Sequence, residues 1–174
     1  MTRFGKVLVF TLVSPTLFGF DWGTKALTRA MPLGAEVELV PGWMSWVHAE
    51  NPDIAFSIPM PMAVVITFGF LALGMLAWML WRLPSDARLH AAALATMAAG
   101  AVGNLADRLV DGSVTDFLRV YTEHPAMAPW LVNAFGTASW PVFNVADVCL
   151  LAGVALWGIA SAFEGEREPE PEPA

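Results

Sequence analysis

The chain has 174 residues, of which 56% are hydrophobic and only 14% are charged, and its mean hydropathy is +0.56. Because about a quarter of the residues in a soluble domain are charged, this composition excludes an ordinary water-soluble globule and indicates a membrane protein. Part of the net charge of −7 lies in the alternating Glu and Pro of residues 164–174, where we expect a disordered tail. The remaining charge is close to balanced, and no basic patch indicates a nucleic-acid partner.

Four segments are apolar over about the 20 residues that a helix needs to cross a bilayer. The first would also fit the core of a signal peptide, because its uninterrupted apolar run covers only Val7 to Phe20. No small-x-small cleavage site follows, however, and good helix formers continue to Thr28, so we expect an uncleaved helix. We therefore predict an all-α membrane protein with one domain over residues 1–163 and four transmembrane helices, at about 4–28, 61–82, 89–110 and 143–163.

The segment between the first two spans has the character of a strand pair. Two β-prone runs, Glu36 to Val40 and Trp43 to Ala49, flank the turn residues Pro41-Gly42. This pattern predicts a small β-element outside the bilayer.

The orientation of the chain follows from Lys and Arg in the short segments beside the spans. Arg3 and Lys6 precede the first span, and Arg82 and Arg88 lie between the second and the third. These residues predict that both termini are cytoplasmic. The bias is slight, since four further basic residues fall on the opposite side, all of them within or beside polar motifs: Lys25, Arg29, Arg108 and Arg119.

Polar residues recur at helical spacing near one end of each span. The clusters are Asp21, Thr24 and Lys25 in the first span, Asn51 and Asp53 before the second, Asn104, Asp107 and Arg108 in the third, and Asn144 and Asp147 in the fourth. Because successive helices alternate in direction, all four clusters reach one face of the membrane. Ionisable groups at membrane depth are costly unless they are paired or hydrated, so this convergence indicates a functional site.

The residue types at this site exclude two common kinds of catalysis. The three histidines are scattered along the chain, so a metal site would lack its usual nitrogen ligands, and we expect no metal and no cofactor. Ser113 and Ser139 lie in predicted loops without a matched His, so neither is a credible nucleophile. The carboxylates are the remaining candidates for catalysis at this site.

Two neighbouring carboxyl groups that share a proton can hydrolyse a peptide without a metal, one as base on a water and the other as acid. Asp147 is one member of such a pair, since it is predicted to be buried and has no cation within a helical turn. Spacing alone leaves its partner open among Asp21, Asp107 and Asp116.

Four short motifs in this order resemble those of the lipoprotein signal peptidases (signal peptidase II), which are integral aspartic proteases of bacterial membranes. Each motif is weak alone, and together with the four spans they are jointly specific over nearly the whole chain except the tail. The motifs are Asp21-Trp22-Gly23-Thr24-Lys25, Gly103-Asn104-Leu105-Ala106-Asp107-Arg108, Val114-Thr115-Asp116-Phe117 and Phe143-Asn144-Val145-Ala146-Asp147.

The resemblance implies a role for each polar residue. Asp116 and Asp147 would be the catalytic pair, with a substrate pocket lined by Asn51, Asn104, Arg108 and Asn144 and supported by Asp21, Lys25 and Asp107. Residues of about 35–56 would form an extracytoplasmic β-cradle, and about 119–140 a mobile lid.

The resemblance also implies the substrate and the setting. The substrate would be a prolipoprotein whose lipobox cysteine already carries diacylglycerol, cut just before that cysteine. The enzyme would lie in the bacterial cytoplasmic membrane among lipids, with its site near the extracytoplasmic face, and we expect it to act as a monomer.

One motif departs from the family. The usual Asn-x-Gly-Ala-Ala-Phe is here Asn51-Pro52-Asp53-Ile54-Ala55-Phe56, with a carboxylate in place of glycine. Asp53 would perturb proton sharing in the pair or narrow the substrate range, as expected of a divergent paralogue with its own clients.

Two other classes of function fit part of the pattern. A small ion-coupled transporter also needs intramembrane carboxylates, but its sites lie near the midplane and its halves repeat, and neither feature is present in this sequence. A non-catalytic relative that binds lipoprotein precursors would keep the fold without cleavage.

Overall fold

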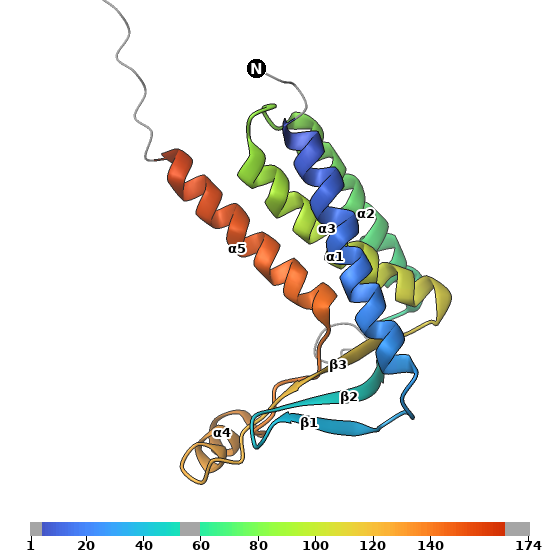
Figure 1. Ribbon diagram of the computed structural model, residues 1–174, viewed down its shortest axis with the longest axis vertical. Coiled ribbons are helices and arrows are strands. Elements are labelled where there is room, and N and C mark those ends of the chain that lie inside the picture. Colours follow the sequence, from blue (N-terminus) through green and yellow to red (C-terminus); the bar gives the residue numbers. More distant parts are fainter. Residues whose placement is uncertain (1–4, 53–59, 166–174) are drawn as a thin grey trace, which may run out of the picture.

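The computed structural model describes residues 5–52 and 60–165 of the chain. Its elements in chain order are α1 (Gly5–Arg29), β1 (Glu36–Val40), β2 (Met44–Asn51), α2 (Met62–Arg82), α3 (Arg88–Val110), β3 (Val114–Val120), α4 (Ala128–Phe135) and α5 (Val145–Gly165). The long helices form a bundle, and the sheet and α4 lie at one end of it (Figure 1). Asp53 and residues 166–174 of the predicted tail lie outside the described residues.

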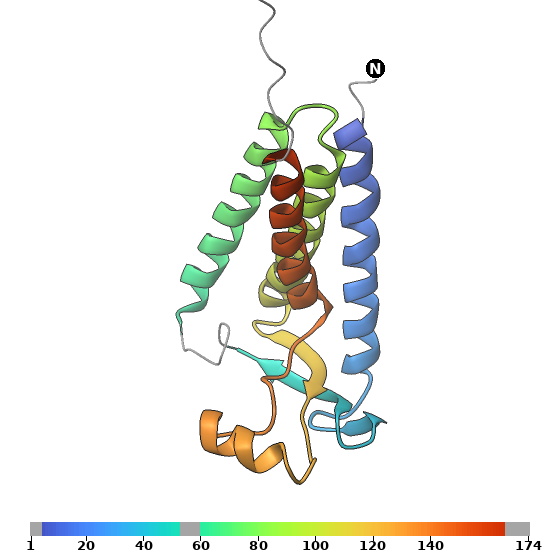
Figure 2. The ribbon, with the colours of Figure 1, turned by 90° about the vertical axis from the view of Figure 1, so that its left-hand side faces the viewer.

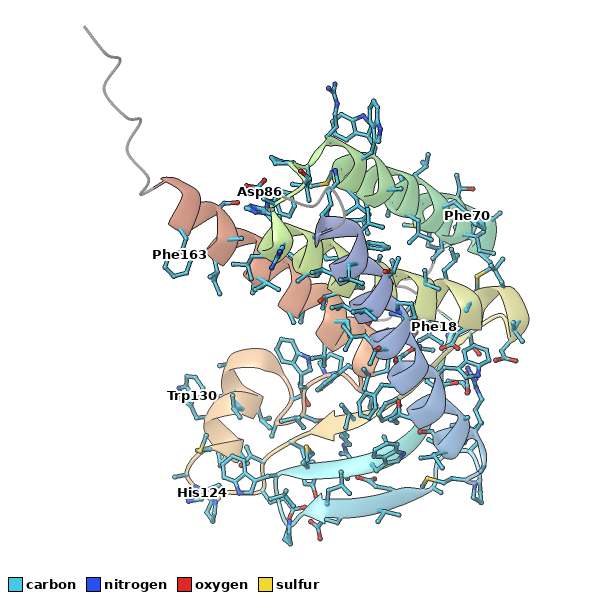
Figure 3. The ribbon with its side chains drawn as sticks, turned by 45° about the horizontal axis from the view of Figure 1, so that its top comes forward. Phe18, Phe70, Asp86, His124, Trp130 and Phe163 are labelled. Atoms are coloured by element: carbon cyan, nitrogen blue, oxygen red, sulfur yellow. The ribbon has the colours of Figure 1, made fainter. Side chains whose placement is uncertain are left out.

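Four helices in the described part of the chain, α1, α2, α3 and α5, are long and apolar enough to cross a membrane. Their outward side chains are apolar: Phe70 of α2 and Phe163 of α5 point away from the bundle and are more than half exposed (Figure 3). A surface of this kind is stable in lipid and not in water. The predicted fold class, an all-α membrane protein with a small β-element, is confirmed.

Helix α3 is the centre of the bundle and packs against α1, α2 and α5 (Figure 2). Small residues make this close approach possible, because they let helix backbones come together. A Cβ on Gly100 would collide with the carbonyl oxygen of Ala146 in α5, and a Cβ on Gly153 of α5 would lie 2.9 Å from the carbonyl oxygen of Ala93. The spacing between α3 and α5 therefore depends on these glycines.

The end of the bundle away from the sheet is tied by one lysine. Lys6 Nζ donates to the carbonyl oxygens of Leu80, Trp81 and Leu83, at 2.9, 3.1 and 2.5 Å. These carbonyl groups at the end of α2 thereby receive hydrogen bonds that the helix itself cannot supply. The start of α1 is thereby fixed beside the α2–α3 connection.

The sheet has three antiparallel strands in the order β1-β2-β3. The first two are the predicted pair. The third, β3, was not predicted as a strand, although Asp116 lies in it, opposite Ala49 of β2. Trp46 of β2 stacks on Phe117 of β3 with ring centroids 4.5 Å apart, and its Nε1 donates to Thr28 of α1 at 2.9 Å. These contacts fasten the sheet to the bundle.

Helix α4 lies within the segment that was expected to form a lid. It begins with a proline in its first turn and ends at Gly136, whose φ of 77° favours glycine. Apolar residues including Trp43, Leu131 and Trp140 line a pocket between α4 and the sheet.

Candidate active site

The predicted site residues meet where the bundle adjoins the sheet. Contacts between side chains, or through one backbone carbonyl, connect all nine into one network: Asp21, Lys25, Asn51, Asn104, Asp107, Arg108, Asp116, Asn144 and Asp147. Helices α1, α3 and α5 and strands β2 and β3 each supply at least one of them. The predicted convergence at one level of the bundle is therefore present for these nine residues, while Asp53 lies outside the described part of the chain.

Asn144 directly precedes α5, and Asp147 lies in the first turn of that helix. The Asn144 side-chain oxygen accepts from the Asp147 N–H at 3.0 Å, and Asp147 Oδ2 accepts from the Asn144 N–H at 3.1 Å. This reciprocal pair is a capping box, which satisfies two backbone donors at the helix start. The local sequence thus fixes the direction in which the Asp147 carboxylate points.

Asn104 of α3 holds the other oxygen of Asp147. Its Nδ2 donates to Asp147 Oδ1 at 2.8 Å, while its Oδ1 accepts from Lys25 Nζ and from Asn144 Nδ2, both at 3.1 Å. An amide has distinct donor and acceptor atoms, so Lys25 on one side and Asp147 on the other determine its orientation.

Asp116 lies on β3 and is almost fully buried. Its Oδ1 accepts from Asn144 Nδ2 at 2.8 Å and its Oδ2 from Asn51 Nδ2 at 3.2 Å. Burial, and then the charge of the nearby Asp147, raise the pKa of Asp116 to about 7, and the two amide donors oppose this only in part. Near neutral pH this carboxyl group is therefore able to hold or release a proton.

A buried ion cluster lies behind these groups. Lys25, fully buried on α1, contacts Asp21 at 2.9 Å and Asp107 at 2.8 Å. The second oxygen of Asp21 accepts from the Ala146 N–H at 2.8 Å, which ties α1 to the start of α5. The cluster joins α1, α3 and α5 at the level of the site.

Arg108 supplies a further cation beside the pair. It lies one helical turn beyond Asn104, and its Nη1 donates to the Asn104 carbonyl oxygen at 3.2 Å. The guanidinium interacts electrostatically with Asp147, Asp116 and Asp107.

Comparison with known proteins gives the family. Residues 13–163 match the model for signal peptidase (SPase) II. A lipoprotein signal peptidase of Geobacter sulfurreducens is 36% identical, over 85% of this chain and 88% of its own. Another, from Geobacter metallireducens, is 34% identical over 92% of this chain and 94% of its own. The chain belongs to the signal peptidase II family.

Two solved structures share the fold of this signal peptidase II chain. Both are described as a bacterial membrane enzyme studied by the in meso method. One has a TM-score of 0.75 at 25% identity, over 95% of this chain and 94% of its own, and the other has 0.69 at 26%, over 87% and 91%. The resemblance inferred from the motifs is thus confirmed, and with it a protease of the bacterial membrane that processes lipoprotein precursors.

Sequence reasoning missed three residues that belong to the network. Arg29 of α1 contacts Asp107 at 2.5 Å, and Thr115 and Glu50 join it from β3 and β2. Arg29 continues the spacing of Asp21 and Lys25 by four residues, so the helical period carried a signal for it. Thr115 lies in the motif around Asp116 but was given no role of its own, and no helical period pointed to Glu50. Their partnership depends on the pairing of two strands distant in sequence.

Proposed function

We propose that this signal peptidase II works as an aspartic endopeptidase in which Asp116 and Asp147 are the catalytic pair. One observation carries the proposal: Asn144 holds both carboxylates, its Nδ2 donating to Asp116 and its backbone N–H to Asp147. The same residue therefore sets the position of both groups. Asp21 and Asp107, the other partners considered from the sequence, are bound to Lys25 instead.

The chemistry needs one ionised and one neutral carboxyl group. Asp116, whose pKa is raised to about 7, is the neutral member, and Asp147 is the base. Asp147 takes a proton from a water whose oxygen attacks the peptide carbonyl carbon, and Asp116 gives its proton to the carbonyl oxygen. When the resulting gem-diol collapses, Asp116 takes back a proton from one of its hydroxyls as the carbonyl re-forms, the C–N bond breaks, and Asp147 gives its proton to the leaving nitrogen.

The remaining predicted residues have supporting roles in this scheme. Asn51, Asn104, Arg108 and Asn144 line the substrate pocket. The buried cluster of Lys25, Asp21 and Asp107 holds its charged groups in fixed positions behind the catalytic pair.

The substrate is a prolipoprotein that carries diacylglycerol on its lipobox cysteine, and the cut falls just before that cysteine. A site at the end of a lipid-exposed bundle supports this choice, because a lipid-anchored substrate diffuses laterally to it. We infer that this end is extracytoplasmic, that both termini are cytoplasmic, that α4 acts as a lid and that the enzyme acts as a monomer among membrane lipids.

A cleavage assay on the purified protein in detergent tests the function. Lipidated precursor should be cut before the cysteine, the same precursor without lipid should be cut far less, and the Asp147→Asn variant should bind lipidated precursor without cutting it. Binding by the wild-type protein without any cleavage would instead indicate a non-catalytic precursor-binding relative. Neither binding nor cleavage, together with proton-coupled uptake in vesicles, would indicate a transporter.

A further inference from the structure

Thr115, the residue before Asp116, is held through each of its polar groups. Its hydroxyl donates to Glu50 Oε1 at 3.0 Å and accepts from Arg29 Nε at 2.9 Å. Its N–H donates to Asp107 at 3.4 Å, and its carbonyl oxygen accepts from Asn144 at 3.4 Å. The side chain is fully buried, so no water replaces these partners if they are lost.

Glu50 of β2 binds the same part of β3 from the neighbouring strand. It lies opposite Thr115 in the register of β2 and β3, and its other oxygen accepts from the Ser113 hydroxyl at 2.6 Å. His48 Nε2 lies 3.1 Å from Oε1. Burial raises the pKa of Glu50, but the hydrogen bonds from Ser113, His48 and Thr115 outweigh it and leave the pKa below its usual range. Glu50 is therefore an ionised acceptor for both hydroxyls at the start of β3.

Arg29 connects this strand pair to the helices. It contacts Asp107 of α3 at 2.5 Å and Asp111 at 3.2 Å through Nη2, and its Nε is the donor to Thr115. Its guanidinium therefore bridges α1, the end of α3 and β3. A planar guanidinium with donors in fixed directions suits such a bridge.

The side chains on the two faces of β3 have different partners. Side chains alternate along a strand, so Asp116 faces away from Glu50 and Thr115 and toward Asn51, which donates to it. Any shift of the strand between α1 and β2 moves the Asp116 carboxylate relative to Asp147 on α5.

We propose that Glu50, Thr115 and Arg29 form a clamp that positions Asp116 for catalysis from the opposite face of β3. This proposal rests on the proposed function, because it assumes that Asp116 is catalytic. The three are positioning residues: their polar contacts in the described part of the chain are with one another and with residues outside the catalytic pair, and they act through the strand.

Two substitutions at Thr115 distinguish positioning through its hydroxyl from packing of its side chain. Thr115→Val keeps the shape and removes the hydroxyl, whereas Thr115→Ser keeps the hydroxyl and removes a methyl group. A misplacement of a catalytic group by about 1 Å costs up to about a hundredfold in rate, so we expect Thr115→Val to lower kcat about ten- to a hundredfold. KM should change less than about twofold, since the substrate-facing residues are untouched, and Thr115→Ser should stay within about twofold of wild type in both constants.

Glu50→Gln and Glu38→Gln form a matched pair on the same sheet. Glu38 Oε1 also accepts two hydrogen bonds, from the Gly42 N–H and the Tyr121 hydroxyl, but it does not touch Thr115. We expect Glu50→Gln to lower kcat by about tenfold, through a smaller shift of the same strand, and Glu38→Gln to leave it unchanged.

A second measurement does not depend on cleavage. Hydrogen exchange of the β3 amides, followed by mass spectrometry, should be faster in Thr115→Val than in wild type and unchanged in Thr115→Ser. If Thr115→Val keeps both wild-type kcat and wild-type exchange, or if Thr115→Ser is as impaired as Thr115→Val, the clamp is wrong. An inactive wild-type protein would overturn the proposed function instead, and the exchange rates would still decide whether the clamp holds the strand.

Discussion

Side-chain amides organise the charges of the site at the scale of single residues. Asn104 donates to Asp147 and accepts from Lys25, so one residue satisfies a carboxylate and a cation at once. Asn144 donates to Asp116 and to Asn104, and its N–H donates to Asp147. Neutral amide donors thus hold both carboxylates in place, and those on Asp116 lower its pKa by less than burial and the charge of Asp147 raise it.

The raised pKa of Asp116 predicts how activity and stability depend on pH. Because burial and Asp147 raise this pKa to about 7, Asp116 loses its proton as pH rises through that value. The pair is then doubly ionised, and kcat/KM should fall on the alkaline side of a bell-shaped profile. The folded pKa lies above the unfolded value of about 3.9, so the stability contributed by this group is complete below about pH 4 and is lost as pH rises through about 7.

Cleavage rates and thermal unfolding of the detergent-solubilised protein between about pH 4 and pH 9 check both statements. The control is Asp116→Asn, whose thermal stability should lack this pH dependence. A kcat/KM that stays level from pH 6 to pH 9 would show that Asp116 is not the proton donor.

Lys25→Met should strongly destabilise the fold. It leaves Asp21 and Asp107 buried without their shared cation, and removing one partner of a buried pair costs about 3–5 kcal/mol. Arg119→Met is the contrast, because the pair of Arg119 with Glu36 is exposed and worth at most about 1 kcal/mol. Unfolding monitored by tryptophan fluorescence compares the two, and equal losses of stability would contradict the account of the cluster.

At the scale of elements, the sequence was informative wherever a local pattern determines the structure. The transmembrane helices follow from apolar length, and the β1–β2 pair follows from β-prone runs around Pro41-Gly42. The third strand was missed because its residues carry no alternating pattern: Val114 to Phe117 are all buried, between β2 and the helices. Helix α4 has only 8 residues, which is too short for a helical period to stand out in sequence.

The catalytic pair shows the same division between local and long-range information. The i, i+3 spacing of Asn144 and Asp147 predicted their common place at the start of a helix. Elimination by residue type left three partners for Asp147, and spacing alone did not choose among them. The choice of Asp116 needed the family motif or the tertiary structure, because β3 reaches Asn144 only through the fold.

Gly103→Ala should disturb the junction of α1, α3 and α5. A Cβ at this position would collide with Asp21 Oδ2 and lie 3.2 Å from the Ala146 Cβ, so the Asp21 carboxylate has to shift and the first turn of α5 has to give by a few tenths of an ångström. We expect a loss of about 1–3 kcal/mol in stability and a lower kcat, since Asp147 is in that turn. The matched control is Gly74→Ala on α2, where a Cβ meets nothing within 4 Å.

Gly74→Ala should be neutral or stabilise the helix by up to about 1 kcal/mol, because alanine is the better helix former. Thermal unfolding and the cleavage rate of the two variants make the comparison. If they behave alike, α3 and α5 do not depend on Gly103 for their spacing.

At the scale of the whole molecule, the charges at the two ends of the bundle set its orientation in the membrane. Lys6, Arg82 and Arg88 lie at the end away from the sheet, where α1 begins and α2 and α3 are joined (Figure 1). The polar site lies at the other end. We expect the first end to be cytoplasmic and the site to face the extracytoplasmic side.

Cysteine labelling in intact cells tests this orientation. With Cys149 first replaced by Ala, an Asn133→Cys variant in α4 should react with a membrane-impermeant maleimide. An Asp86→Cys variant in the α2–α3 connection should react only after the cells are opened. The opposite pattern would invert the topology.

The central claim, that Asp116 and Asp147 act as one catalytic unit, is tested most directly by single-turnover cleavage of lipidated precursor by three Asn variants. Asp116→Asn and Asp147→Asn should each abolish cleavage and still bind precursor, because Asn keeps the shape but cannot take up or release the proton. The double variant should lose little more than either single one, since residues that act as a unit are not additive. Asp107→Asn should show a lesser defect, through its lost ion pairs with Lys25 and Arg29. Near-normal cleavage by Asp116→Asn, with none by Asp107→Asn, would contradict the assignment of the pair.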